Sequence, residues 1–390
     1  MFFDYSAEQQ DFRDSLRKLV ADRAPLSAVR ARLGDAHDPD LWRTVCDEMA
    51  LLTLAVPERY GGGGFSLEET AIAVAELGRG LAPVPLFEAV LAIEAILRTG
   101  TEAQRQELLP GLLSGERIAV AAMAGPDGFD PGTKPVIASP ASPAGAASPA
   151  SPAGAASPAS PAGAAPPGHA LTGSLRHVLR AHVADLLIVP ALTPDGPALF
   201  VAERTAPGVT VSEPGSSFDL TRPVCAVALD AVPAVRLGDG TGPGLDDLLD
   251  VGRTLLAAEM TAAAEACLDA AVEYAKHRVQ FNRAIGSFQA VKHGSAQLAV
   301  EIDAARAAAD WAAMLATAGD PGLRTSALIA KAQAAETFTA CAGWNIQVHG
   351  GIGFTWEHDA HLYLRRAKAD EALFGSTARH RAMLADRVGL

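Results

Sequence analysis

The stretch RVQFNRAIGSFQAVKH, residues 278–293, contains side chains that suit an anionic ligand. An arginine such as Arg278 can bind a phosphate group through two parallel hydrogen bonds. The amide of Gln289 can hydrogen bond to a sugar or to the edge of an adenine ring, and Phe281 lies between the two in the sequence. The pattern alone is weak, because an arginine at a helix end is more often a solvated cap.

A second stretch, QVHGGIGF at residues 347–354, strengthens this interpretation. Gln347 adds another amide, and Gly350 and Gly351 follow the end of an expected helix. Glycine has no side chain, so its backbone can approach a ligand closely. The two stretches therefore predict the cradle of a large anionic ligand.

The composition is that of a globular protein and excludes several partners. The 390 residues are 49% apolar, which is enough for two or three packed subdomains. The net charge of −13 disfavours nucleic acid and anionic membrane surfaces. No apolar run approaches the ~20 residues of a membrane span, and the start MFFDYSAEQQ lacks the order of a signal peptide, so we expect a cytoplasmic protein. Scattered spacing predicts buried, reduced thiols at Cys46, Cys225, Cys267 and Cys341.

The residue pattern predicts a mainly α fold with a small β domain in the middle. Helical periodicity begins after a capping box at Ser6 and covers an N-terminal domain, residues 1–117. Short β-rich runs predict a β-barrel-like domain over residues 118–240, interrupted by a Ser/Pro/Ala/Gly repeat at residues 139–165. We expect this repeat to be a disordered and dispensable insertion. Long helices with small-residue stripes predict an antiparallel four-helix bundle over residues 241–390.

The segments YAKHRVQFNRAIGSFQAVKH and NIQVHGGIGFTWEHDAHLYLRRA resemble the two C-terminal signatures of the acyl-CoA dehydrogenase family. VPERYGGGGFSLEE and ELGRGLAPVP resemble its N-terminal domain. The resemblance implies FAD as cofactor, an acyl-CoA thioester as ligand, and a dimer or a dimer of dimers. It also implies which residues reach across a subunit interface to the FAD of the neighbouring chain: Arg278, Phe281, Gln289, Gln347, Gly350 and Gly351. Asn282 stands where the family usually has Gly, and we expect this change to affect only a helix end.

The resemblance further implies oxidation of an acyl-CoA between its α and β carbons. In the family a carboxylate removes the α proton while a hydride passes from the β carbon to the flavin. That base is usually a Glu directly before Gly-Thr or Gly-Ser, where this chain has Phe374. A second known placement, early in the first bundle helix, falls on Gly252. The catalytic residue is therefore unknown. We expect Asp370 and Glu371 to lie on a solvated helix face, although they and Asp250 are the next candidates.

The flavin side departs from the family pattern as well. The family's Trp-Ile-Thr, which packs on the isoalloxazine and hydrogen bonds to it, aligns with His177, Val178 and Leu179. Leu179 has no hydroxyl to donate, and we expect His177 to lie on the surface. The residues offered to a neighbour's FAD are kept, whereas those serving the chain's own flavin and base are replaced. The chain therefore resembles the partner subunits of heteromeric members, in which one chain supplies the base and the other completes the cofactor site.

Two other interpretations stay open. One is a non-redox acyl-CoA-binding or structural member of the fold, and the other keeps the thioester but performs an elimination or a hydroxylation. Both a homo-oligomer and a hetero-oligomer with a related subunit fit the sequence. His358 and His361 lie one helical turn apart, but no carboxylate and histidine motif completes a metal site, so no metal is expected.

Overall fold

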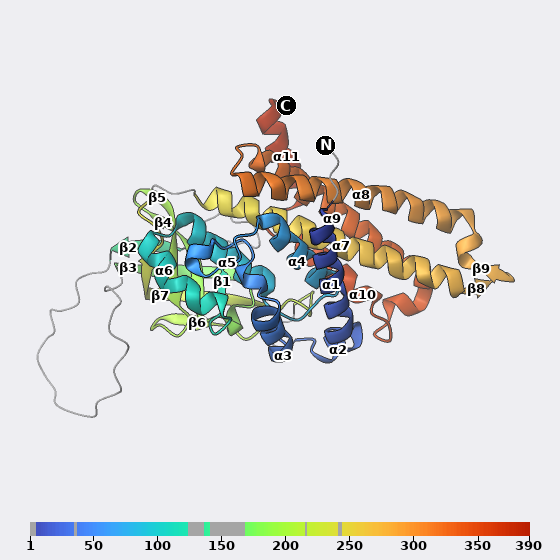
Figure 1. Cartoon of the computed structure of the whole chain (residues 1–390), viewed down its shortest axis with the longest axis horizontal. Coiled ribbons are helices and arrows are strands. Elements are labelled where there is room, and N and C mark those ends of the chain that lie inside the picture. Colours follow the sequence, from blue (N-terminus) through green and yellow to red (C-terminus); the bar gives the residue numbers. More distant parts are fainter. Residues whose placement is uncertain (1–4, 35–36, 124–135, 141–167, 215–216, 241–243) are drawn as a thin grey trace, which may run out of the picture.

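The computed structural model describes residues 5–34, 37–123, 136–140, 168–214, 217–240 and 244–390. The predicted order of helices, a small β region and helices is confirmed (Figure 1). Most of the repeat insertion lies outside the described residues, which include only its first two, Ser139 and Pro140. Within the described ranges, no helix has the length and apolar character that crossing a membrane requires.

The N-terminal region consists of helices and the loops between them, with no strand in its described part. Its first helix begins where the sequence predicts, because the Ser6 and Gln9 side chains cap each other's backbone N–H groups. Two further helices begin with the same box, at Ser66 and at Thr101. The helices are α1 (Ala7–Arg23), α2 (Leu26–Ala31), α3 (Pro39–Arg43), α4 (Leu67–Arg79), α5 (Leu86–Thr99) and α6 (Glu102–Leu113).

The middle region is a small β-barrel. Strand β4 pairs with β2 and β5, and the order β2-β3-β7-β5 closes the ring, while β1 joins β4 and β6 joins β7. Irregular register in β3 produces bulges, one of them between Leu175 and Val178. The strands are β1 (Ala119–Ala121), β2 (Ile137–Pro140), β3 (His169–Leu179), β4 (Leu186–Thr193), β5 (Gly196–Glu203), β6 (Val209–Val211) and β7 (Val224–Arg236).

The C-terminal region is built on three long helices that pack against each other, with two shorter ones against the third. A two-stranded hairpin joins the first two long helices, and a last helix follows Gly375 as predicted. The elements are α7 (Leu245–His277), β8 (Val279–Gln280), β9 (Arg283–Ala284), α8 (Gln289–Ala318), α9 (Leu323–His349), α10 (Ala360–Ala372) and α11 (Thr377–Val388).

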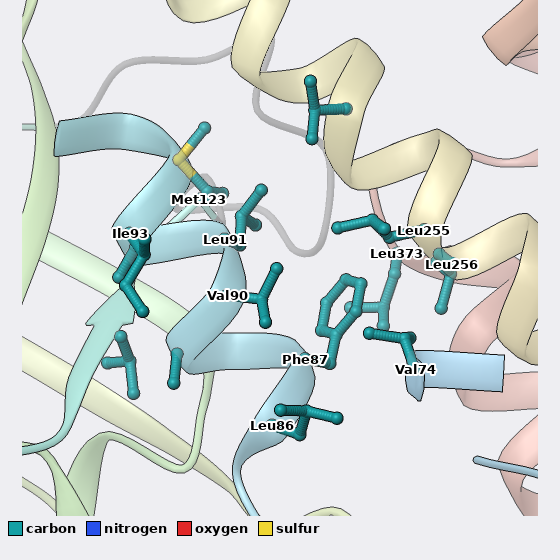
Figure 2. Packing of buried hydrophobic residues seen from close by; sticks show 14 of the residues in the cluster. Val74, Leu86, Phe87, Val90, Leu91, Ile93, Met123, Leu255, Leu256 and Leu373 are labelled. Carbon is teal, nitrogen blue, oxygen red and sulfur yellow. The ribbon is translucent and has the colours of Figure 1, made fainter. Parts of the chain in front are cut away.

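One apolar core joins the three regions. Figure 2 shows its centre, where Phe87 and Leu91 of α5 face Leu255 and Leu256 of α7, and Leu373 lies between the two helices. Leu373 directly follows α10, so the core holds the end of that helix against α5 and α7. The four cysteines are buried and free, as predicted.

Candidate active site

The hairpin after α7 carries the first group of predicted site residues. Arg278 is the cap residue of α7, and β8 and β9 then pair with only two residues between them. These two, Phe281 and Asn282, have φ angles of 52° and 60°. Positive φ at both central positions is what a two-residue hairpin turn requires to match the twist of its strands.

The expectation that Asn282 affects only a helix end is wrong. Asn282 occupies the second central position of the turn, and Asn tolerates positive φ better than most residues other than Gly. Phe281 has no such tolerance, and a residue held in this region is strained by about 1–3 kcal/mol. Its side chain is nevertheless 86% exposed, so no burial within the chain offsets that strain. An exposed aromatic ring on a strained turn is typical of a binding surface.

The structure brings the two predicted stretches together at one end of the bundle. The ring of Tyr274, in the last turn of α7, lies 4.2 Å from the ring of His349, the last residue of α9. Arg278 and the loop beginning with Gly350 are therefore neighbours. This end, which carries β8 and β9, lies at the opposite end of the long axis from the barrel (Figure 1). Residues there cannot serve a ligand seated on the chain's own barrel.

The polar side chains of this end are available for a ligand. Arg278, Gln289 and Gln347 are all exposed, and none of the three side chains bonds to another described residue. Gly350 has φ +67°, which favours glycine, and Gly351 beside it is exposed. The group supplies one cation, two amides and an approachable backbone. We call these five residues, together with Phe281, the tip.

The two positions from which the family's base operates face each other. Phe374 is buried at 5% exposure, and its ring lies 6.1 Å from that of Phe87. A Cβ placed on Gly252 would come within 3.2 Å of two Phe374 ring carbons and 3.4 Å of Leu91. Glycine at 252 therefore leaves the space that the Phe374 ring occupies. The two departures from the family pattern form one complementary packing arrangement.

The space around Phe374 is nearly full. The cavity that Phe374 lines with Phe87, Leu91 and Met123 has a volume of about 20 Å³. That is close to the smallest volume that holds one water molecule, roughly 10–15 Å³. An acyl chain cannot enter this part of the structure unless Phe374 moves.

Three cationic or imidazole side chains hold the backbone around Phe374. The Lys331 ammonium donates to the carbonyl oxygens of Glu371 at 2.6 Å and of Gly375 at 3.0 Å. The Phe374 carbonyl accepts from His380 Nε2 at 3.0 Å and from Arg253 at 3.4 Å. Burial lowers the pKa of Lys331 to about 7 and that of His380 to about 4. These bonds keep Phe374 in the left-handed region at φ 57°, so its ring is held in the apolar space.

The expectation that Asp370 lies on a solvated helix face is wrong. Its side chain is fully buried and accepts a hydrogen bond of 2.9 Å from Arg222. Arg222 also bonds both oxygens of Glu259 at 2.6 Å. Burial raises the pKa of Asp370 to about 7, with Glu259 adding to the rise and Arg222 opposing it. Asp370 is therefore bound in an ion-pair network, where it stabilises the junction of α7, α10 and the segment before β7.

The other two candidate carboxylates are also engaged. Glu371 is partly exposed and pairs with Lys368 at 2.9 Å, so the expectation of a solvated position is confirmed for this residue. Asp250 is buried between Arg253 at 2.6 Å and Arg324 at 3.0 Å. Neither carboxylate lines the cavities beside Phe374.

His177 does not lie on the surface, contrary to expectation. It is half-buried in the β3 bulge with φ 59°, and burial lowers its pKa. His177 and Leu179 line a cavity of about 520 Å³ between the barrel and α10, and Asp370 and Leu373 form part of the opposite wall. The segment that aligns with the flavin-contacting residues of the family therefore does face a cavity, but it presents a leucine there instead of a hydroxyl.

The histidines near the tip contact aromatic rings. The ring of His358 lies 4.2 Å from that of His349, and the ring of His361 lies 4.5 Å from that of Trp356. Among the described residues, no group of three or more His, Cys, Asp or Glu side chains could hold a metal ion.

Sequence reasoning missed the side chains that support the site. Lys331, Arg222 and Arg366 are all buried, and Arg366 bonds Asp219 at 2.6 Å and Glu259 at 2.8 Å. One signal was present, because Arg366 and Asp370 are four residues apart and thus share a helix face. Their partners lie more than a hundred residues earlier in the chain, so local pattern could not distinguish this face from a solvated one.

A helical region, a small barrel and a helical bundle, in this order, define a flavoprotein dehydrogenase fold. Models of the N-terminal and C-terminal domains of acyl-CoA dehydrogenases match residues 6–116 and 244–389. The acyl-CoA dehydrogenase IpdE2 of Mycolicibacterium smegmatis is 32% identical over 372 residues, which is 95% of each chain. The chain belongs to the acyl-CoA dehydrogenase family.

Two solved structures of similar chains come from assemblies that are each named after two proteins. A variant of the Tcur3481–Tcur3483 steroid ACAD superposes with a TM-score of 0.85 at 31% identity, covering 98% of both chains. The ChsE4–ChsE5 complex from Mycobacterium tuberculosis superposes with a TM-score of 0.84 at 28% identity, covering 100% of this chain and 99% of the other.

FAD is the cofactor of this family and acyl-CoA thioesters are its substrates. The tip fits the pyrophosphate and adenosine part of FAD, because its guanidinium and two amides have no partner among the described residues and its glycines are exposed. The cavity beside Leu179 fits the flavin ring less well, since that side chain cannot donate a hydrogen bond. The tip therefore fits an FAD that rests on the barrel of another chain.

Proposed function

We propose that this chain is the subunit without a base in a heteromeric, FAD-dependent acyl-CoA dehydrogenase. It lends its tip to an FAD held on a related chain, and that chain supplies the carboxylate that removes the α proton. The buried contact between Phe374 and Gly252 carries this proposal, because it fills the position of the base with an apolar ring. The likeness to the ChsE4–ChsE5 and Tcur3481–Tcur3483 structures supports a heteromer.

At the tip, each residue has a separate task towards the partner's cofactor. Arg278 neutralises the pyrophosphate, Gln289 and Gln347 hydrogen bond to polar atoms of the nucleotide, and Gly350 with Gly351 lets the backbone approach it. Phe281 covers an apolar part of the cofactor or of the partner's surface. Bound FAD would accept the hydride that leaves the β carbon.

At its own barrel, among the described residues, neither position of the family's base carries a carboxylate. Phe374 cannot accept a proton, and Asp250 and Asp370 are engaged by arginines. Loss of a positioned general base typically lowers the rate by about 10² to 10⁴. Turnover therefore takes place at the partner's base.

The substrate class and the compartment extend this proposal. The described likeness to a steroid ACAD supports a bulky alicyclic acyl-CoA as substrate of the pair. Four buried cysteines without disulfides support a reducing, cytoplasmic location.

The test compares two arginines of one hairpin. The chain is co-expressed with a family member that has Glu at the position of Phe374, and bound flavin is quantified by absorbance after gel filtration. We expect Arg278→Ala to weaken FAD binding by about 1.5–3 kcal/mol. Arg283→Ala is the control, because it removes the same charge directly after the turn, where Arg283 stacks on Phe288 at 4.0 Å.

Two results would overturn the proposal. One is equal flavin retention by the Arg278→Ala and unaltered assemblies. The other is a homo-oligomer of this chain that carries one flavin per subunit and reduces it rapidly with an acyl-CoA. A chain that binds acyl-CoA but no flavin in either assembly would instead support the non-redox alternative.

A further inference from the structure

Three aromatic rings from separate elements are stacked beneath the tip. The Tyr274 ring on α7 lies 4.2 Å from the His349 ring at an interplanar angle of 32°. The His349 ring lies 4.2 Å from the His358 ring at 43°. We call Tyr274, His349 and His358 the stack. It links the end of α7, the end of α9 and the loop that precedes α10.

The hydrogen bonds of the two histidines fix which nitrogen carries the proton. His349 Nδ1 lies 2.8 Å from the carbonyl oxygen of Asn345, so this nitrogen donates. His358 Nδ1 lies 3.1 Å from the backbone nitrogen of Ala360 and accepts its N–H, so the proton of His358 is on Nε2. His358 is therefore neutral in this arrangement, and a second proton on its Nδ1 would break the bond to Ala360.

The stack lies next to both halves of the tip. Tyr274 is one helical turn before Arg278, and the backbone N–H of Arg278 donates to the Tyr274 carbonyl at 2.9 Å. His349 directly precedes Gly350. We propose that His349 and His358 are positioning residues, which hold the glycine loop and the Arg278 hairpin in one geometry only while the His358 ring is neutral. The inference rests on the proposed function for the role of the tip in binding FAD, whereas the geometry of the stack does not depend on that function.

Charges around His358 oppose its protonation. Burial lowers the pKa of His358, with His349 and Arg30 adding to the fall and Asp359 opposing it. Arg30 on α2 bonds both Asp359 and the backbone carbonyl of Trp356, so it brings a fixed positive charge to this loop. His361, on α10, is lowered in pKa by burial and then by Arg365. Protonation of His358 thus places a cation among other cations.

The sign of the pH dependence follows from that shift. The pKa of His358 is lower in the folded chain than its ordinary value of 6.5, so the opened loop takes up protons more readily than the closed one. The stabilisation is complete above pH 6.5 and falls as the pH drops below it. We expect the tip to be ordered at neutral pH and to open in mild acid.

The experiment needs neither flavin nor partner. Amide hydrogen exchange of the purified chain is measured between pH 7.5 and 5.5 over residues 350–354 and 278–283, with correction for intrinsic rates. Side-chain NMR with labelled histidine follows the titration of His358. The test variant is His358→Asn, whose side-chain oxygen can accept the Ala360 N–H in place of Nδ1 but cannot take up a proton in this pH range. His277→Gln is the control, since His277 is exposed on α7 and bonds Glu273 outside the stack.

We expect a loss of protection in both segments as the pH falls from 7.5 to 5.5, in the unaltered chain and in His277→Gln alike. His358→Asn should lose this pH dependence while keeping its protection at pH 7.5. Protection that is independent of pH in the unaltered chain would overturn the inference, as would an unchanged pH profile in folded His358→Asn. Should His358→Asn fail to fold, a His358 titration with an unshifted pKa in the unaltered chain would overturn it. A wrong proposed function would be detected separately, because the assembly that carries Arg278→Ala would then retain its flavin.

Discussion

The tip and the pocket around Phe374 differ in how their side chains are satisfied. At the tip, Arg278, Gln289 and Gln347 end in solvent without a partner among the described residues. Around Phe374, the ring packs so closely on Gly252 that a Cβ at residue 252 would lie 3.2 Å from it. A group that acts on another chain must stay unsatisfied within its own, whereas a closed pocket must be satisfied internally. The tip is thus an incomplete site, and the pocket is complete without a ligand.

The largest expected effect is on the turnover rate, and it tests whether the pocket around Phe374 is closed. We expect the chain alone to turn over acyl-CoA about 10² to 10⁴ times more slowly than its assembly with a Glu-bearing partner. Phe374→Glu should raise the rate of the chain only in combination with Leu179→Thr, which returns a hydroxyl to the cavity wall. Steady-state rates of the single and double variants, with an added electron acceptor and FAD, provide the measurement. Rapid turnover by the unaltered chain would show that the base lies elsewhere.

A smaller effect should come from crowding the pocket. Gly252→Ala should destabilise the fold by about 1–3 kcal/mol, because the new methyl group meets the Phe374 ring. Phe374→Leu should relieve part of this loss, which a double-mutant cycle from chemical denaturation would detect as a coupling energy. Gly343→Ala on α9 is the matched control, since a Cβ there meets nothing within 4 Å. For the same steric reason, Gly252→Glu cannot restore a base unless Phe374 is made smaller.

The smallest effect should come from the repeat, which belongs to neither region. Deletion of residues 139–165 would remove Ser139 and Pro140, which pair with Ala170 and His169 in the barrel. We therefore expect deletion of residues 142–166, with a short turn in their place, to change stability by no more than ~1 kcal/mol. Thermal unfolding checks this, and a loss of many degrees would show that the repeat packs on the barrel.

The sequence was sufficient where a local pattern decides the structure. Capping residues placed the start of α1, helical periodicity placed the bundle, and the positions of Arg278 and Gly350 predicted two loops that the structure brings together. The role of these residues in binding flavin stays a prediction. The fold order needed no knowledge of tertiary contacts, because each region has its own period of apolar residues.

The sequence was insufficient where a partner distant in the chain decides the environment. Asp370 lies in a charged run that is typical of a solvated helix, and only Arg222, on a separate segment, makes its burial possible. The position of Asn282 was predicted wrongly, because strands of only two residues on each side of a turn are too short to recognise in the sequence. His177 was misplaced because a bulge, and not the strand period, sets the direction of its side chain.

The ion-pair network around Arg222 also affects how the chain can be completed during synthesis. Arg222 and Glu259 leave the ribosome well before Asp370 on α10, and Arg222 bonds to both. Burying Asp219 without Arg366 would leave this carboxylate without its arginine, which is strongly unfavourable. The junction of barrel and bundle therefore closes only as translation ends. In a chain that stops before α10, the charged side chains at this junction would stay exposed to water, and the junction would be accessible to cellular proteases.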